Sequence, residues 1–482
     1  MFDKSNDSAP RWLTSNMLNF VEKHSTLILI PLYLAAIYFG SIFLPDAISC
    51  RLISNVPGEL TFHSTPSEIM TCFGGSDMGS YIRGAFALEE HGLAAFTSLG
   101  YGTWPPGFSF LELGIIRANI LPFPIVLFSI TALLWSIVFH RLYYLLRQTT
   151  EVGVLLAVFA PLFLLILPFI YNIAIHYYLY WSEPISAAIF LIAILDIWRL
   201  ALLGKGISIV WAIYFGFLFA ACAYLRAQYD LIFMAMSGMA FLVLLIHWKY
   251  AAKRDISNNP LSRKIYKTWI ISILLIFATF QSLVLIYKMH RYEIANTATL
   301  ASVSYIFENA WMQGDDLRAR GGGFFVDGGG NSLCAVDAMK CSEFEARRRL
   351  GEKISIDEYM KAAFLVVINK PVDFFSYKFQ YFWRAWINHI NNDSLVVIFF
   401  NDLFSICLVI AGVAGFRKTR RYYLTELALF SAIFIGATAF SWIIHFEPRY
   451  LLPVKLIGFV WIFVIVARLP TVKRTTTSTA LG

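Results

Sequence analysis

Apolar residues fill this chain in uninterrupted blocks that short polar segments separate. A helix of about 20 apolar residues crosses the hydrocarbon core of a bilayer, and about ten blocks reach or approach that length. They occupy residues 26–45, 123–145, 152–171, 184–203, 208–225, 229–248, 268–288, 395–415, 424–444 and 452–469. The pattern predicts an all-α polytopic membrane protein with about ten membrane-spanning helices, and roughly nine to eleven are compatible with it.

One short apolar segment, residues 106–120, leaves the number of spans open. It contains Glu112 and Arg117, and it is shorter than a membrane-spanning helix. We expect a tilted or re-entrant helix at this position. A full crossing would change the number of spans by one.

Composition agrees with this pattern. Apolar residues make up 58% of the chain and charged residues only 15%, whereas soluble proteins average about 45–50% and about 25%. These values exclude a cytosolic enzyme, a disordered chain and a collagen-like fibre. The net charge of +8 does not indicate nucleic-acid binding, because the basic residues stand between apolar blocks, as the positive-inside rule requires.

The basic residues also assign the two sides of the membrane. They follow the second, fourth, sixth, eighth and last blocks, at Arg141, Arg147, Arg199, Lys205, Lys249, Lys253, Arg254, Arg263, Lys264, Lys267, Arg417, Lys418, Arg420, Arg421, Arg468, Lys473 and Arg474. All of them fall on the cytoplasmic side if the chain begins there. The expected parts are a cytoplasmic segment without a cleaved signal peptide (1–25), a first transmembrane module (26–288) that includes an extracytoplasmic loop (46–105), a large extracytoplasmic loop (289–394), and C-terminal spans with a short cytoplasmic tail (395–482).

The two long loops each contain a pair of cysteines. Cys50 and Cys72 lie in the first loop, and Cys334 and Cys341 lie in the second. We expect each pair to form a disulfide in an oxidising compartment, with four free thiols as the alternative. No histidine or further cysteine stands at zinc-ligand spacing near them, so the sequence gives no support for a metal site.

Ionisable and aromatic residues gather at the expected outer ends of the spans, where each is a functional candidate. In residues 73–92, Asp77 and Tyr81 stand four apart on one face of an amphipathic helix that also carries Arg83. A partly desolvated Asp77 can act as a general base towards an acceptor hydroxyl. The alternative is that Asp77 only caps the helix.

Three further segments supply candidates at the same edge. Glu183 precedes Pro184 in the first turn of a helix and lies near His176 among aromatics, an arrangement that fits either a helix dipole or a sugar-binding wall. Arg226 offers a planar fork for phosphate, or it pairs with Asp230. The segment HFEPRY contains His445, Glu447, Arg449 and Tyr450 within six positions. We expect this group to bind an anion such as a phosphate headgroup.

Other motifs are weaker. Trp104 suits a membrane interface before Pro105 and Pro106, which favour a helix start. The glycine-rich residues 318–331 lack the Lys-Ser/Thr of a phosphate-binding loop and favour a flexible lid or a linker. Residues 354–386 have the pattern of an interfacial helix pair, rich in aromatics with basic residues at the margins.

Taken in order, these motifs resemble the GT-C superfamily of membrane glycosyltransferases, which includes protein O-mannosyltransferases and the lipid A aminoarabinose transferase. The resemblance rests on Asp77 with Tyr81, the Pro-Pro pair, Ser-Glu-Pro at Glu183, Arg226, and Arg-Tyr-Leu-Leu-Pro at residues 449–453. The chain differs from these members because its expected soluble mass is the internal loop 289–394. That pattern is closer to bacterial enzymes that modify O-antigen or cell-wall polysaccharide.

The resemblance implies a function and a role for each motif. A sugar would pass from a polyprenyl-phosphate donor to a glycan or lipid-linked acceptor, with inversion, at the periplasmic face of a bacterial inner membrane. The first loop has no pair of aspartates at metal-binding spacing, so we expect neither a metal nor another cofactor. Asp77 would be the base. Arg226, Arg449, Tyr450 and Arg83 would bind the donor phosphate, and Glu183, Tyr81, His176, His445, Glu447 and Trp104 would contact sugar or acceptor. A lipid-linked glycan flippase, and a polymerase or ligase that uses a diphosphate-linked donor, are the alternatives.

Overall fold

The structure is a computed structural model of the chain. It describes residues 20, 23–41, 48–50, 57–73, 77–97, 105–150, 152–166, 180–253, 260–295, 336–376, 378–379, 403, 406–407, 410, 426, 429–438 and 454–465. The expected span at 395–415 falls mostly outside these residues.

The described part is helical, apart from one short antiparallel strand pair. The helices are α2 (Ser25–Ser41), α4 (Pro66–Phe73), α5 (Asp77–His91), α6 (Ala94–Thr97), α7 (Gly107–Ala118), α8 (Phe123–Thr149), α9 (Val154–Ile166), α11 (Glu183–Leu202), α12 (Ile209–Leu225), α13 (Gln228–Lys253), α14 (Pro260–Ala295), α18 (Ala338–Arg349) and α19 (Ile356–Asn369). Two further helices cover Leu429–Thr438 and Val454–Ile465. The strands β1 (Ile48–Ser49) and β2 (Glu59–Leu60) pair Ile48 with Leu60.

Four of the described helices are long and apolar enough to cross a membrane, judged by length and composition. They are α8, α11, and the parts of α13 and α14 at Gln228–Ile246 and Lys267–Met289. Shorter apolar helices stand at other expected blocks: α2, α12, Leu429–Thr438 and Val454–Ile465. The prediction of a helical protein with several candidate membrane spans is confirmed, and the number of about ten spans stays a prediction.

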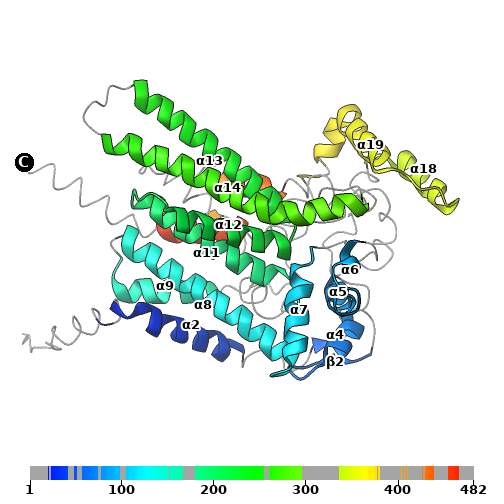
Figure 1. The fold of residues 1–482 in the computed structure, drawn as a ribbon, viewed down its shortest axis with the longest axis horizontal. Helices are drawn as coiled ribbons and strands as arrows, with labels where there is room; N and C mark the ends of the chain where they lie inside the picture. The colour runs from blue at the N-terminus through cyan, green and yellow to red at the C-terminus, as the bar shows by residue number, and fades with distance from the viewer. Residues whose placement is uncertain are drawn as a thin grey trace, which may run out of the picture.

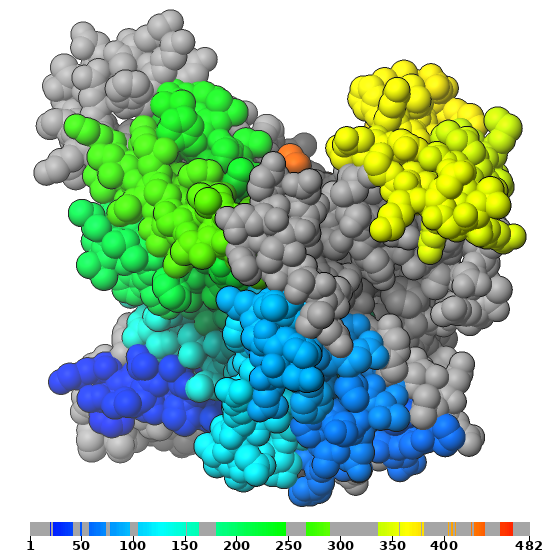
Figure 2. Space-filling view, turned by 45° about the vertical axis from the view of Figure 1, so that its right-hand side comes forward, coloured from blue at the N-terminus to red at the C-terminus, as the bar shows by residue number. Residues whose placement is uncertain are grey.

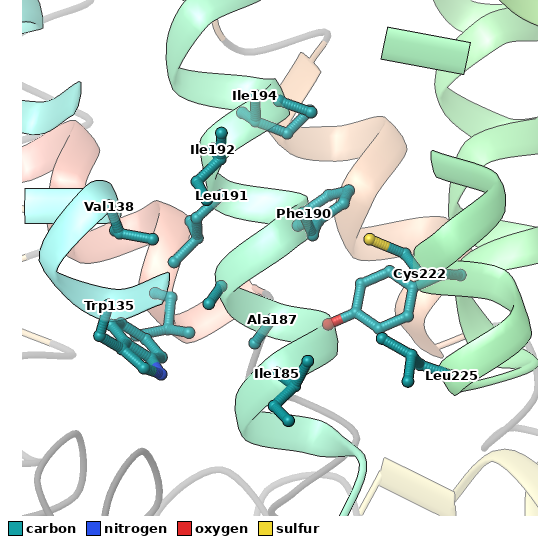
Figure 3. Close-up of a cluster of buried hydrophobic side chains, with 14 of the residues drawn as sticks. Trp135, Val138, Ile185, Ala187, Phe190, Leu191, Ile192, Ile194, Cys222 and Leu225 are labelled. Atoms are coloured by element: carbon teal, nitrogen blue, oxygen red, sulfur yellow. The ribbon is translucent and has the colours of Figure 1, made fainter. Parts of the chain in front are cut away.

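The long helices lie side by side as a bundle, with α11 at its centre (Figure 1). Helix α11 packs against α8 on one side and α12 on the other, and α12 packs against α14. Figure 3 shows this arrangement, with Trp135 and Val138 of α8 and Cys222 and Leu225 of α12 on opposite sides of α11. Most side chains of α11 are buried, as expected for a helix that other helices surround.

One end of the bundle contains a buried cluster of charges. It includes Arg141 and Arg199, which the sequence analysis used only as markers of the cytoplasmic side. Arg141 Nε and Arg199 Nη2 lie 3.2 Å and 3.3 Å from the two oxygens of Asp196, which is buried on α11. Nearby, Glu426 accepts hydrogen bonds from the indole N–H groups of Trp198 and Trp461. These contacts join α8, α11 and the helix Val454–Ile465 at the expected cytoplasmic end.

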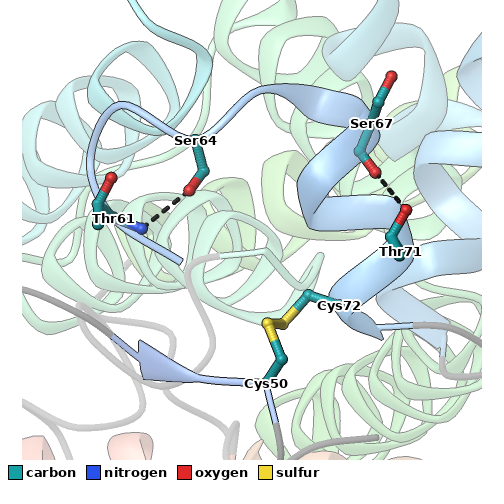
Figure 4. The surroundings of a disulfide bond; sticks show 6 residues. All are labelled: Cys50, Thr61, Ser64, Ser67, Thr71 and Cys72. Carbon is teal, nitrogen blue, oxygen red and sulfur yellow. Dashed lines mark hydrogen bonds between the residues drawn. A yellow bond between two sulfur atoms is a disulfide. The ribbon is translucent and has the colours of Figure 1, made fainter. Parts of the chain in front are cut away.

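The opposite end carries the compact unit β1, β2 and α4–α7. Cys50, next to β1, and Cys72 of α4 form a disulfide (Figure 4), which ties the strand pair to the helix before α5. Cys341 is also disulfide-bonded, while Cys334 lies outside the described residues. Disulfides form and persist in oxidising compartments.

Residues 106–120, whose crossing of the membrane the sequence leaves open, contain helix α7. It has 12 residues and ends at Asn119, whose φ of 44° is left-handed. Twelve residues extend about 18 Å, well short of the roughly 30 Å of a bilayer core. Helix α7 is therefore too short to cross the bilayer core by itself. It lies across the ends of α8 and α12 and packs mainly against α5.

Candidate functional site

Four polar side chains form a closed, buried ring at the end of the bundle next to α5. Arg226 Nη2 lies 3.0 Å from Glu183 Oε1, and Arg226 Nη1 donates a hydrogen bond to the Tyr81 hydroxyl at 3.2 Å. The Tyr81 hydroxyl lies 3.2 Å from Ser182 Oγ, which donates to Glu183 Oε2 at 3.4 Å. All four residues are at most 3% exposed.

Three separate parts of the chain supply this ring. Ser182 and Glu183 stand at the start of α11, where Glu183 is the first helical residue and Pro184 follows. Arg226 has an extended backbone between α12 and α13, and its backbone N–H donates to the Cys222 carbonyl at the end of α12. Tyr81 comes from α5. The prediction that Glu183 occupies the first turn of a helix is confirmed.

The donor and the acceptor of each hydrogen bond in the ring can be assigned. Each hydroxyl has a single proton to donate, and Ser182 donates its proton to Glu183, so Tyr81 must donate to Ser182 and accept from Arg226. The guanidinium thus reaches Glu183 both directly and through two hydroxyl groups. Removing any one member leaves a buried polar group without a partner in the ring, which is costly at low dielectric.

Close helix contacts hold Tyr81 in place. The Ser109 hydroxyl of α7 donates to the Tyr81 carbonyl at 2.8 Å, and the Phe108 ring packs edge-on against the Tyr81 ring. Gly84 makes this approach possible, since a Cβ there would lie 2.7 Å from Ser109 Oγ. Arg117 also pairs with Glu89. Both polar contacts join residues 28 apart, so α5 and α7 run parallel.

A second glycine brings α7 to the segment that carries Arg226. A Cβ on Gly107 would lie 2.6 Å from the Tyr224 carbonyl oxygen, near the end of α12. The first turn of α7 therefore lies directly against the backbone two residues before Arg226. The Pro105-Pro106 pair precedes this contact, and Pro106 is the N-cap of α7, as the sequence predicts.

The alternative pairing of Arg226 with Asp230 is not the arrangement in the structure. Arg226 pairs with Glu183, while Asp230 Oδ2 lies 2.5 Å from Lys288 Nζ of α14. Both residues of this second pair are mostly buried. Arg226 and Lys288 are thus each paired with a carboxylate from another element of the fold.

Other predicted site residues are only partly placed. Helix α5 begins at Asp77, one turn before Tyr81, and the Asp77 side chain lies outside the described part. Arg83 donates to Ser80 of its own helix. Six further candidates fall outside the described residues: Trp104, His176, His445, Glu447, Arg449 and Tyr450.

Sequence reasoning missed two buried polar residues here. Ser182 completes the ring, and its only signal was a hydroxyl residue directly before Glu183. Glu112 of α7 is 0% exposed, and neither carboxylate oxygen has a hydrogen-bond partner among the described residues. Burial raises the pKa of Glu112 well above its ordinary value. The signal for a buried acid was the position of Glu112 within the apolar segment 106–120.

The described residues include no group of three His, Cys, Asp or Glu side chains that could hold a metal ion. The site is instead a charge-balanced network of one guanidinium, one carboxylate and two hydroxyl groups. Such a network can bind an oxyanion if the anion replaces the carboxylate at the planar fork of the arginine.

Comparison with known proteins leaves the family open. No protein-family model matches the chain, and none of the curated proteins compared with it is significantly similar. The resemblance to GT-C glycosyltransferases therefore rests on the short motifs quoted above.

Proposed function

We propose that the protein is a multi-pass membrane glycosyltransferase of the GT-C type, with its active face in the periplasm of a bacterial cell. It transfers a sugar from a polyprenyl-phosphate donor to an extracytoplasmic acceptor, such as O-antigen, another cell-surface polysaccharide or a lipid-linked glycan. The single observation that carries the proposal is the buried Arg226–Glu183 pair, closed by Tyr81 and Ser182.

Buried ionisable residues near a membrane edge are expensive to place and support a functional role. The ring gathers Tyr81, Glu183 and Arg226, three candidates that the sequence places far apart. It also lies one turn from the start of α5, where Asp77 stands. A structural ion pair alone would not need this convergence with the other candidates.

The proposed reaction is a single displacement. The acceptor oxygen attacks the anomeric carbon while the bond from that carbon to the phosphate oxygen breaks, and the configuration inverts. The acceptor proton passes to Asp77, and the polyprenyl phosphate leaves with the bonding electron pair. Proton transfer to a general base typically accelerates such a step by about 10²–10⁴-fold. Neutralising the departing phosphate, through Arg226 in a low-dielectric site, is the larger contribution.

Arg226 is only 3% exposed, so the phosphate reaches it when the ring opens. In the resting protein Glu183 and Tyr81 hold the guanidinium in a fixed orientation. The phosphate then takes the place of the carboxylate, which is free to accept a hydrogen bond from a sugar hydroxyl.

The test is transfer of a labelled sugar from a polyprenyl-phosphate donor in proteoliposomes, with Asp77→Asn as the main variant. We expect the transfer rate to fall by at least about 100-fold. Glu90→Gln is the matched control because Glu90 is an exposed acid on the same helix, and its transfer should equal wild type.

Three results would overturn the proposal. Full transfer by Asp77→Asn would remove the base. Movement of the lipid across the bilayer without a new glycosidic bond would identify a flippase. Transfer from a diphosphate-linked donor, with none from the monophosphate, would identify a polymerase or ligase.

A further inference from the structure

Helix α19 exposes an apolar ridge on the surface of the described part of the chain. Met360, Phe364 and Ile368 follow one another at intervals of four residues, and their exposed fractions are 46%, 65% and 55%. Side chains four apart lie above one another on a helix surface. Leu365, at 46% exposed, widens the ridge.

The opposite face of α19 already has its own core. Tyr359, Ala362 and Val366 are buried together with Phe344 of α18, and the Tyr359 and Phe344 rings meet edge-on at 4.9 Å. Arg347 of α18 also pairs with Glu358 of α19. The ridge therefore does not complete the α18–α19 unit, because that unit packs through other residues.

The position of the unit favours a lipid surface as the partner of the ridge. Helices α18 and α19 lie at the same end of the bundle as α5 and α6 (Figure 1), and they project from the surface as a separate lobe (yellow in Figure 2). The chain reaches this unit from α14, whose Lys267–Met289 part is a candidate span. The unit is thus tethered to a helix that ends at the surface of a bilayer.

The charges along the ridge point to the same partner. Lys361 is exposed between the apolar side chains, one turn before Phe364 and Leu365. A lysine in that position buries its methylene stem with its neighbours and extends its ammonium to a phosphate headgroup. The acidic residues of α19 stand in its first turn, where Arg347 neutralises Glu358. A protein partner would leave Lys361 in need of a dedicated acid, whereas a lipid surface offers phosphate everywhere.

We propose that the α19 ridge lies in the outer leaflet of the membrane that the bundle crosses, with the helix axis along the surface. Phe364 and Ile368 enter the boundary between headgroups and acyl chains. The α18 surface with Arg349 faces water. The loop between α14 and the C-terminal helices is thereby held at the membrane surface on the side of the Tyr81–Arg226 ring.

The experiment places a nitroxide on the full-length protein in liposomes of phosphatidylethanolamine and phosphatidylglycerol. Cys222 and Cys407, the free cysteines of the described part, are replaced so that single labels can be attached through Phe364→Cys, Ile368→Cys or Arg349→Cys. Both ridge positions are exposed, so substitution does not disturb the core. Collision with oxygen reports a lipid environment, and collision with a water-soluble nickel complex reports water.

We expect oxygen collisions to exceed nickel collisions at positions 364 and 368 and the reverse at position 349. Adding Lys361→Glu should reduce the oxygen excess at position 364, because the headgroup contact becomes repulsive. Nickel access at 364 and 368 equal to that at 349 would overturn the proposal. Protection from both probes, with spin–spin broadening that grows with protein density, would also overturn it by identifying a second copy of the chain as the partner.

Discussion

Arg226 and Glu183 form an ion pair in which both side chains are almost fully buried, with 3.0 Å between Nη2 and Oε1. Glu183 begins α11, whereas Arg226 lies between α12 and α13. Each charge lies where the low dielectric makes an uncompensated ion very costly. This relationship explains why an arginine stands at the expected outer edge, where the positive-inside rule disfavours it.

Breaking this pair on one side should destabilise the protein strongly. Arg226→Gln leaves the Glu183 carboxylate without its cation, and we expect a loss of about 3–5 kcal/mol. Thermal unfolding in detergent measures it. The double variant Arg226→Met with Glu183→Leu removes both charges and should recover most of the stability. A structural role for Arg226 predicts that the stable double variant retains transfer, whereas the proposed phosphate contact predicts that transfer stays lost.

Tyr81→Phe should weaken the ring without changing its charges. The change removes the hydroxyl that accepts from Arg226 and donates to Ser182, and leaving such groups unsatisfied costs about 1–3 kcal/mol. Tyr38→Phe is the matched control, because Tyr38 also bonds to a serine hydroxyl, on Ser129, but at an exposed position. Its effect on the unfolding temperature should be close to zero. Equal effects of the two variants would show that the ring adds no stability.

Two glycines of α7 separate the effect of a close helix contact from the effect of helix propensity on stability. Gly107→Ala places a methyl group 2.6 Å from the Tyr224 carbonyl oxygen, so α7 and α12 must separate at a cost of about 1–3 kcal/mol. Gly114→Ala, on the same helix, meets no atom within 4 Å and should stabilise by up to about 1 kcal/mol. Unfolding in detergent compares the two. A neutral Gly107→Ala would contradict the close approach.

The α18–α19 unit should loosen at low pH through Glu358. Hydrogen bonding to Arg347 holds the pKa of Glu358 below its ordinary value. A lowered carboxyl pKa adds stability at pH values above the ordinary glutamate range, and this contribution is lost as pH falls through the lowered pKa. Hydrogen exchange of the α19 amides, corrected for the intrinsic pH dependence, should rise in that window. Glu358→Gln should abolish the rise, while the neighbouring Asp357→Asn should retain it.

Much of the architecture follows from the order of residues along the chain. The apolar blocks at 123–145 and 184–203 became α8 and α11, because helix formation satisfies backbone hydrogen bonds locally and a long apolar segment has few other solutions in lipid. The helix of Asp77, Tyr81 and Arg83 and the helix start at Glu183 are local features too. Local patterns predict them because capping, dipole and proline effects act within one turn.

The partners of the charged residues could not be predicted in the same way. The pattern allowed Arg226 to pair with Asp230 four residues later, yet it pairs with Glu183, and Asp230 pairs with Lys288. The extended backbone at Arg226 removes the helical geometry that four-residue spacing assumes. Ser182 and Glu112 were missed for a related reason, since burial is set by neighbouring helices.

The sequence by itself therefore predicted a helical protein with several candidate membrane spans, helix starts near Asp77, Pro106 and Glu183, and a small set of charges beside them. Only the tertiary structure decided which of those charges meet. Apolar patterning specifies which residues avoid water, and it is insensitive to which helix lies beside which. The Tyr81–Ser182–Glu183–Arg226 ring exists because Gly84 and Gly107 let α5, α7 and α12 approach closely, and contacts of that kind join residues far apart in the chain.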